Sequence, residues 1–467
     1  MRFLFLCLVI ILLGCTSTEK RQSTFLGGHI VNPNSSVVIL EHKDKPIDTI
    51  PLDHNNNFSY EFSPEEESIY TFRHYPESQT IYLNPGDSLV LRVNTLEFDE
   101  SLSYGGTSSM ENNFLINMFL MNEQDNDLVL SYYKIAPEQF VAKTDSILNL
   151  RHQDLERLNS KAKFTPYFKT IAKQSIDYEH FDMRERYAFL MKKYVPNKFD
   201  EFPNQYFKYR EQVDFNNPHL TSNFSYLRFL DNFLRNKSIE SCEAENRDCF
   251  DLNAHSNLKR RLNLVHELFE NEHLQANFFN RLIRKEIVFS QTQDQLEETL
   301  AIINKFDLQD PDKDELHQLT EVQRKYLLGN DLSYLNLRTE LMDTVELHQV
   351  AQNKPTLLLT WSAKSFEGRR NMTKKVNALK HQFPELNFFS INLDFQTPNL
   401  WQNALKQLPN SLPEFQLISD MPEQGSSFIK NYLNRVYITD QNLVLTSNSL
   451  SVFDSKLENH IQNVLKN

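Results

Sequence analysis

Glycine is scarce in this sequence, with 9 among 467 residues, and none occurs between Gly106 and Gly329. Glycine marks many turns and strand ends, so this long gap predicts helices joined by polar or proline-containing loops over residues 107–328. Apolar residues at helical spacing support this prediction, namely Leu258, Leu262, Val265 and Phe269. Aromatic residues between positions 206 and 233 could line a ligand groove, but we expect most of them in the core of the helical segment.

An excess of positive charge is also absent. The chain has 49 lysines and arginines against 62 acidic residues, which gives a formal net charge of −13, and no basic run offsets it. This balance argues against nucleic acid as a partner. The sequence contains no glycine-rich phosphate-binding loop and no paired-carboxylate motif, so we expect no cofactor.

One group of residues has a spacing that a metal site could use. His266, Glu270 and His273 would share one face of a continuous helix and could bind a metal ion. They lack the His-Glu-x-x-His pattern, and a solvated polar face has the same spacing. We therefore expect no metal site at these positions.

Cysteine is rare too, with four residues in the whole chain. Cys7 and Cys15 lie close to the N-terminus, and Cys242 and Cys249 flank a short polar stretch. The later pair predicts a disulfide that pins a loop. A metal pair and a redox pair are the alternatives. No further cysteine or histidine lies nearby at zinc spacing, and acidic neighbours raise rather than lower the pKa of a thiol.

The chain has no apolar run long enough to span a bilayer, which takes about 20 residues. Residues 3–13 form a shorter apolar run after Arg2, with the length of a signal-peptide core. The run ends in Leu12-Leu13-Gly14-Cys15, which resembles the bacterial lipobox. In that family the signal peptide is cut before the cysteine, and the cysteine carries lipid.

The lipobox resemblance implies a signal peptide over residues 1–14, a lipidated linker over 15–22 and membrane attachment through Cys15. Thr16 stands where an aspartate often retains such lipoproteins in the inner membrane. Thr16 therefore favours attachment to the outer membrane, with the protein facing the periplasm. The alternative is an ordinary signal peptide with an incidental cysteine.

Residues 23–106 contain short β-rich runs separated by turn clusters, for example at residues 53–57 and 84–87. Short strands with turn signals at regular intervals are typical of all-β domains. We therefore predict an N-terminal antiparallel β-sandwich over residues 23–106.

An apolar run at residues 355–360 leads into Trp361-Ser362-Ala363-Lys364-Ser365-Phe366-Glu367-Gly368-Arg369. This segment resembles the active-site turn of the thioredoxin-like family, in particular its TlpA and ResA branch, with the pattern Trp-Ala-x-Trp-Cys-Pro-x-Cys-Arg. Trp361 and Arg369 match the pattern, but Ser365 and Gly368 stand at the two cysteine positions. Because dithiol exchange needs an attacking thiolate and a resolving thiol, the resemblance implies the fold without the redox reaction.

A third position of the family's active site is altered as well. Residues 435–440 resemble the strand usually written Pro-Thr-x-Phe-Leu-Ile-Asp, whose leading cis-proline lies beside the cysteines in active members. Asn434 occupies that position here. A cis bond before a residue other than proline costs about 2.5–4 kcal/mol, so we expect a trans peptide bond before Asn434. The resemblance covers residues 329–467 and implies a C-terminal thioredoxin-like α/β domain.

These observations predict a lipid-anchored envelope protein with three parts, and a redox-inactive thioredoxin-like domain that binds or scaffolds an envelope partner. Such a pseudoenzyme would offer Trp361, Phe366, Arg369 and Arg370 for binding, while Ser365 would begin the following helix as its N-cap. One alternative is a TlpA-type thiol-disulfide oxidoreductase that uses Cys242 and Cys249. Another is an accessory lipoprotein that binds a sugar or peptide on its β-sandwich or helical domain.

Overall fold

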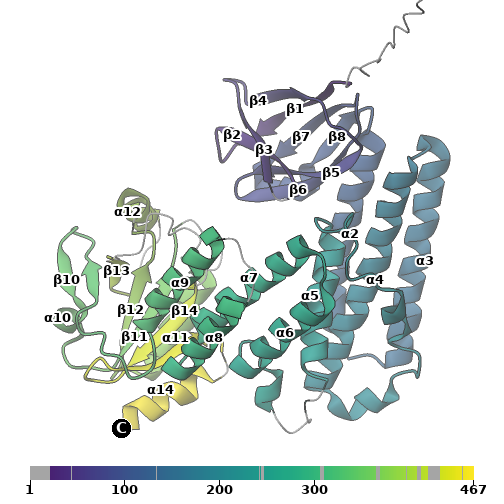
Figure 1. The fold of residues 1–467 in the computed structure, drawn as a ribbon. Coiled ribbons are helices and arrows are strands. Elements are labelled where there is room, and N and C mark those ends of the chain that lie inside the picture. The colour runs from purple at the N-terminus through teal and green to yellow at the C-terminus, as the bar shows by residue number, and fades with distance from the viewer. Residues whose placement is uncertain are drawn as a thin grey trace, which may run out of the picture. The chain divides into compact units, whose positions relative to one another are not determined.

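The computed structural model describes residues 22–43, 45–132, 134–240, 242, 247–305, 310–363, 369–395, 397–407, 412–418, 432–454 and 456–466. Two compact units are present, and the boundary between them falls between Phe233 and Leu234 (Figure 1). The signal peptide and the lipidation position Cys15 lie outside the described residues. Within the described part of the chain, no helix combines the length and apolar character needed to cross a membrane.

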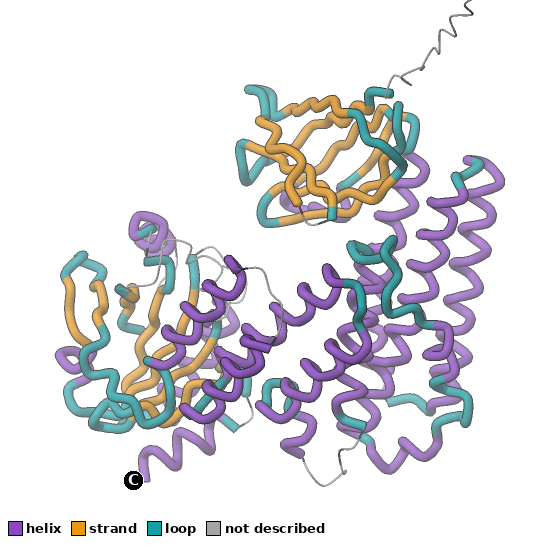
Figure 2. The backbone as a smooth tube through the Cα atoms, viewed as in Figure 1, coloured by secondary structure: helices purple, strands orange, loops and turns teal. Residues whose placement is uncertain are grey.

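The first unit begins with two four-stranded sheets, visible as strands in Figure 2. One sheet has the order β4-β1-β7-β8, made of β4 (Asn57–Phe62), β1 (Thr24–Val31), β7 (Ser88–Asn94) and β8 (Ser103–Gly106). The other has the order β3-β2-β5-β6, made of β3 (Lys45–Pro51), β2 (Val37–His42), β5 (Ser68–His74) and β6 (Glu77–Leu83). Both sheets contribute side chains to one apolar core, including Leu26, Leu40, Phe72 and Leu91.

The prediction of a purely antiparallel sandwich is wrong for one strand pair. β1 and β7 run parallel, with Leu26 opposite Leu89. The chain builds the hairpin of β5 and β6 in the other sheet before it returns, and it then enters β7 in the direction of β1; parallel neighbours require such a crossover connection. Gly28 belongs to this pair, since a Cβ atom there would lie 2.4 Å from the carbonyl oxygen of Leu91.

Helices complete the first unit. They are the short η1 (Thr95–Glu97) and α1 (Phe98–Ser101), the long α2 (Ser109–Tyr132), α3 (Pro137–Ala162) and α4 (Pro166–Tyr194), the short η2 (Pro196–Glu201) and η3 (Lys208–Gln212), and α5 (Phe224–Ser238), which crosses the boundary between the units. Helix α4 begins with an N-cap, because the Thr165 side chain accepts a hydrogen bond from the Phe168 amide.

Asn112 of helix α2 bonds to the backbone of β6 in the sandwich. The Asn112 amide oxygen accepts from the Tyr82 backbone N–H at 2.8 Å, and its Nδ2 donates to the Tyr82 carbonyl at 2.8 Å. Asn112 is fully buried, so both of its bonds are shielded from water. The helix therefore pairs with the backbone of β6 as well as packing against it.

The second unit starts with helices. They are η4 (Arg247–Phe250), α6 (His255–Leu268), α7 (Glu272–Phe289), α8 (Gln293–Lys305) and α9 (Asp310–Arg324). All four residues of the predicted apolar stripe in this region are buried, namely Leu258, Leu262, Val265 and Phe269.

A seven-stranded sheet follows, in the order β10-β9-β13-β12-β11-β14-β15. Its strands are β9 (Asn336–Arg338), β10 (Thr344–Glu346), β11 (Thr356–Trp361), β12 (Asn387–Asn392), β13 (Glu414–Leu417), β14 (Arg435–Thr439) and β15 (Leu445–Ser451). The accompanying helices are α10 (Leu347–Ala351), α11 (Arg369–Gln382), α12 (Pro398–Gln407) and α14 (Leu457–Lys466).

The strand directions define the topology of this sheet. Strands β11, β12 and β13 are parallel, whereas β14 is antiparallel to β11 and to β15. A β-α-β crossover through α11 is thus followed by an antiparallel hairpin and the final helix α14. One face of the sheet packs against α11 and α14 through a core that includes Leu357, Leu359, Val436 and Ile438.

Candidate functional site

The thioredoxin-like motif begins at the carboxyl end of β11. All six residues of this strand are buried, and Trp361 is its last residue. Ser365, Phe366 and Gly368 lie outside the described residues, so the predicted N-cap role of Ser365 stays a prediction. Arg369 and Arg370 are the first residues of α11. The described part of the site is therefore the set of residues that surround the motif.

Asp394, just beyond β12, fixes the residues that lead into the motif. Its Oδ1 accepts from the Ser362 hydroxyl at 2.7 Å, and its Oδ2 accepts from the Ala363 N–H at 2.5 Å. Asn392 donates to the same Oδ2 at 3.0 Å, and Asp394 is 2 % exposed. Parallel strands end at the same edge of a sheet, which is why a residue after β12 reaches the loop after β11.

Trp361 lies in the interior rather than on a binding surface. Its indole N–H donates to Glu414 Oε2 at 3.2 Å, and the ring packs in a small apolar cluster with Trp401 and Ala404. Only 2 % of Trp361 is exposed. The sequence prediction grouped Trp361 with possible partner-binding residues; its burial gives it a structural role at the end of β11.

The backbone at Asn434 differs from that of a proline. Its φ is +59°, and its N–H donates to the Thr360 carbonyl at 3.0 Å. Proline has φ fixed near −65° and has no N–H, so proline fits neither feature. In the described residues the single cis peptide bond precedes Pro76, which agrees with the trans bond expected before Asn434. The position of the family's cis-proline has therefore a different backbone conformation here, as well as a different side chain.

Arg435, the next residue, connects this position to the helical part of the second unit. Its Nη1 donates to the Val288 carbonyl in α7 at 2.9 Å, and the guanidinium carbon lies 4.2 Å from the centre of the Phe289 ring. Arg435 is 5 % exposed, so the contact is shielded from water. The last turn of α7 thus covers the start of β14 beside Asn434.

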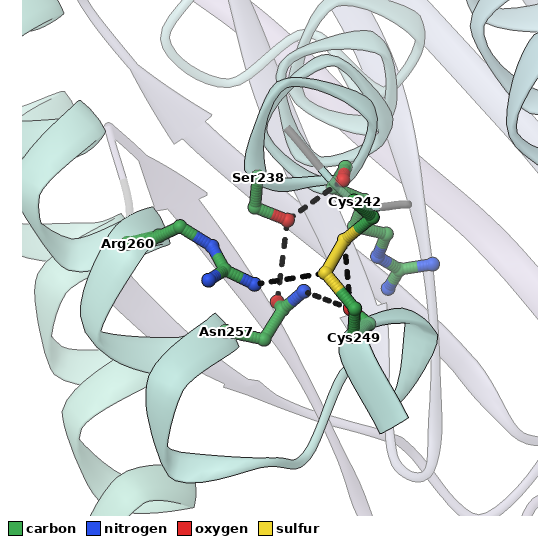
Figure 3. The surroundings of a disulfide bond; sticks show 6 residues. Ser238, Cys242, Cys249, Asn257 and Arg260 are labelled. Carbon is green, nitrogen blue, oxygen red and sulfur yellow. Dashed lines mark hydrogen bonds between the residues drawn. A yellow bond between two sulfur atoms is a disulfide. The ribbon is translucent and has the colours of Figure 1, made fainter. Parts of the chain in front are cut away.

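Cys242 and Cys249 are joined by a disulfide, with their Cα atoms 5.7 Å apart (Figure 3). The bridge lies between the end of α5 and η4. Helix α6 contacts it through Arg260, whose Nη2 lies 3.8 Å from Cys249 Sγ, and through Asn257, which donates to the Cys249 carbonyl at 3.5 Å. These contacts fit a bridge that holds a loop against a helix.

The expectation that His266, Glu270 and His273 share one helix face is wrong. Helix α6 ends at Leu268, and α7 starts at Glu272 with Asn271 as its N-cap. The Asn271 side chain accepts from the Leu274 N–H at 3.0 Å, which starts a new helix between the two histidines. Among the described residues, no cluster of histidine, cysteine and acidic side chains could hold a metal ion.

The aromatic residues between positions 206 and 233 belong largely to the core. Buried members include Tyr206, Tyr209, Tyr226, Phe229 and Phe233. Tyr206 and Tyr209 use their hydroxyls internally, as donors to the Arg184 carbonyl and to Glu185 Oε1.

A feature that the sequence prediction missed is a row of buried carboxylates on α4. Glu179, Asp182 and Glu185 are all fully buried. Arg228 pairs with Glu179 and lies 3.0 Å from Asp182, while Arg210 donates to both oxygens of Glu185 at 2.7 Å. Burial raises the pKa of Glu179 to about 7. The spacing of three residues was a readable signal, because it places the acids on one side of a helix.

No family model and no curated protein matches the chain. Solved structures that resemble it include the thioredoxin domain of a thiol-disulfide oxidoreductase from Bacteroides vulgatus, at 15% identity, 29% of this chain, 96% of that chain and a TM-score of 0.23. A thiol-disulfide oxidoreductase from Bacteroides fragilis is 14% identical over 28% of this chain and 98% of that chain, with a TM-score of 0.23.

The thioredoxin-like fold of the C-terminal part rests on the strand order and connections from β11 to α14 rather than on these scores. A parallel β-α-β unit, an antiparallel hairpin and a closing helix follow one another in this part of the chain. A fold alone does not give an activity, so the function has to be argued from the residues at the site.

Proposed function

We propose that this chain is a lipid-anchored protein of the bacterial envelope whose thioredoxin-like part binds or scaffolds a protein partner and does not exchange disulfides. The main support for this proposal is the backbone conformation at Asn434. Its left-handed φ and its N–H bond to Thr360 replace the geometry of a cis-proline, at a position that α7 covers through Arg435.

The sequence supports the same conclusion. Ser365 and Gly368 stand at the two cysteine positions of the family pattern. A serine hydroxyl cannot form or resolve a mixed disulfide, and glycine has no side chain. Losses at the two cysteine positions and at the proline position together favour a chain that has kept the fold for binding.

Insulin reduction by the full chain tests the absence of redox activity. We expect no turnover by the wild type, and little by the Ser365→Cys/Gly368→Cys variant, because the backbone at Asn434 is unchanged. Turnover by the wild type would overturn the proposal. If that turnover disappeared in a Cys242→Ser/Cys249→Ser variant, it would support a thiol-disulfide oxidoreductase that uses this pair.

Binding is tested by cross-linking the full chain in envelope extract. Charge reversal of Arg369 and Arg370 to glutamate should reduce capture of the partner, since both residues begin the helix that follows the motif. Lys374→Glu, at an exposed position of the same helix, is the matched control. Equal capture by all variants would contradict a role for the start of α11.

Anchoring is tested separately at the N-terminus. Cys15→Ser should abolish lipid attachment and release the protein from membranes, whereas Cys7→Ala, which keeps the run apolar, should not. Membrane fractionation and the intact mass of the protein report the outcome. Unchanged fractionation and acyl mass in Cys15→Ser would remove the lipid anchor from the proposal.

A further inference from the structure

A cavity of about 450 Å³ lies in the first unit, where the second sheet of the sandwich meets the helices. Its lining comes from the ends of β2 and β6, the segment that leads into β5, the start of α4 and the segment before α5. Small-molecule sites usually have volumes of about 300–1,000 Å³ and combine apolar walls with a few placed polar groups. The size of the cavity therefore suits a ligand such as a dipeptide.

Hydrogen bonds hold the walls of this cavity together. Glu67 Oε2 accepts from the Tyr82 hydroxyl on β6 and from the Thr165 hydroxyl at the start of α4, each at 2.5 Å. Asn223 Nδ2 donates to Ser175 Oγ at 2.6 Å, which ties the segment before α5 to α4. The cavity is thus enclosed by parts of the first unit that are bonded to one another.

One wall of the cavity is aromatic and apolar. The rings of Tyr167 and His219 meet edge to face, with centroids 5.9 Å apart. Ile69 and Pro218 belong to the same lining. Such a wall can pack against an apolar side chain of a ligand.

Two exposed side chains of opposite charge, Lys43 and Glu66, also line the cavity. Within the described part of the chain, neither forms an ion pair or a side-chain hydrogen bond, with the other or with any third residue. Both act on His42: burial lowers its pKa most, Lys43 lowers it further, and Glu66 raises it. The two charges therefore lie near the same lining residue without neutralising each other.

The other titratable groups of the lining do not change this balance. His42 Nε2 lies 2.9 Å from Ser68 Oγ, and its ring is stacked on Tyr70 with centroids 4.8 Å apart, so a lowered pKa leaves it neutral at pH 7. Glu67 adds a second carboxylate, which already accepts from two hydroxyls. A lining with one ammonium group and carboxylates is complementary to a ligand that carries both signs of charge.

We propose that this cavity binds a short zwitterionic peptide, a dipeptide with an apolar side chain and both ends unblocked. The peptide carboxylate pairs with the Lys43 ammonium group, and the peptide ammonium group pairs with the Glu66 carboxylate. The apolar side chain packs against the Tyr167 ring. One ligand then supplies an opposite charge to each of the two side chains.

Calorimetric titration of the full chain tests this proposal, with L-alanyl-L-leucine and L-leucyl-L-alanine as probes. We expect at least one of them to bind. Its N-acetyl derivative and its C-terminal amide should each bind at least 5-fold more weakly, because each lacks one of the two charges. Binding of neither dipeptide, or equal affinity for the dipeptide and either blocked derivative, would overturn the proposal.

Two variants assign the charges to the two ends of the ligand. Lys43→Met should weaken dipeptide binding at least 5-fold and leave binding of the amide unchanged, because the amide has no carboxylate to lose. Glu66→Gln should do the same for the dipeptide and the N-acetyl derivative. Lys45→Met and Glu65→Gln change exposed residues outside the lining and are the matched controls.

A structural role for these residues would give a different result. If Lys43→Met weakened binding of the dipeptide and of the amide equally, Lys43 would not pair with the carboxylate, and the proposal would be wrong. Unchanged dipeptide affinity in both variants would overturn it as well. These results do not depend on insulin reduction or on partner capture.

Discussion

At the residue scale, Asn434 carries the most information about the thioredoxin-like site. The sequence shows directly that proline is missing there, but it cannot show the sign of φ. Asparagine tolerates the left-handed region better than most residues, so the side chain and the backbone agree at this position. Restoring the family's proline should therefore damage the fold instead of repairing the site.

Asn434→Pro should lower the free energy of unfolding by about 3 kcal/mol, since it forces φ to change sign and removes the bond to Thr360. Asn434→Gly is the matched control and should have a small effect, because glycine adopts positive φ freely. Urea denaturation of the full chain measures both. Equal stability of the proline variant and the wild type would show that the backbone can adapt at this position.

His255 at the start of α6 provides a second residue-scale prediction. It is paired with the buried carboxylate of Glu286, which raises the pKa of His255 above its ordinary 6.5. A histidine with a raised pKa stabilises the fold below pH 6.5, and this contribution is lost as the pH rises through the folded-state value.

His255→Gln should therefore lower the stability of the fold mainly below pH 6.5. The variant should also lose less stability than the wild type as the pH rises above 6.5. His381→Gln, at an exposed position of α11, should keep the wild-type profile. Thermal melts between pH 5 and 8 compare the variants. A His255→Gln profile parallel to that of the wild type would refute the linkage.

At the element scale, local sequence patterns predicted the positions of strands and helices, but they did not predict which strands pair. Turn clusters and β-rich runs marked the strands of the sandwich, but the parallel pair of β1 and β7 depends on which sheet each intervening strand joins. The break between α6 and α7 was readable in principle, because Asn271 is a good N-cap residue. Apolar periodicity that continues across such a break predicts one helix where two exist.

The Cys242–Cys249 bridge should be oxidised in the exported protein, so thiol labelling without reductant should modify neither cysteine. A Cys242→Ser/Cys249→Ser variant should be less stable by about 2–3 kcal/mol, the loop-closure value for so short a loop. Denaturation with and without a phosphine reductant measures this, and reductant should leave the double variant unchanged. Full labelling of the native protein would contradict the bridge.

At the scale of the whole molecule, the helical segment and the thioredoxin-like segment of the second unit share buried contacts. Asn448 on β15 donates to the carbonyls of Ser290 and Tyr326, and Arg435 donates to that of Val288. The sequence placed a boundary at Gly329, where a change in glycine content is visible. It could not reveal these contacts, because each joins residues more than a hundred positions apart.

A fragment of residues 329–467 should therefore be less stable than one of residues 234–467, by at least about 3 kcal/mol, because buried donors such as the Arg435 guanidinium would lose their acceptors. Circular dichroism and urea denaturation of the two purified fragments compare them. Equal stability would show that the sheet does not need α7 and α9.

The amide of Asn112 has a consequence for solubility. Strand β6 is the last strand of its sheet, and an unpaired strand edge is a template on which other chains can add β-structure. By occupying both the N–H and the carbonyl of Tyr82, a side chain of α2 takes the place that a foreign strand would use. This one asparagine thus blocks the addition of a strand at Tyr82 on the β6 edge of the sheet.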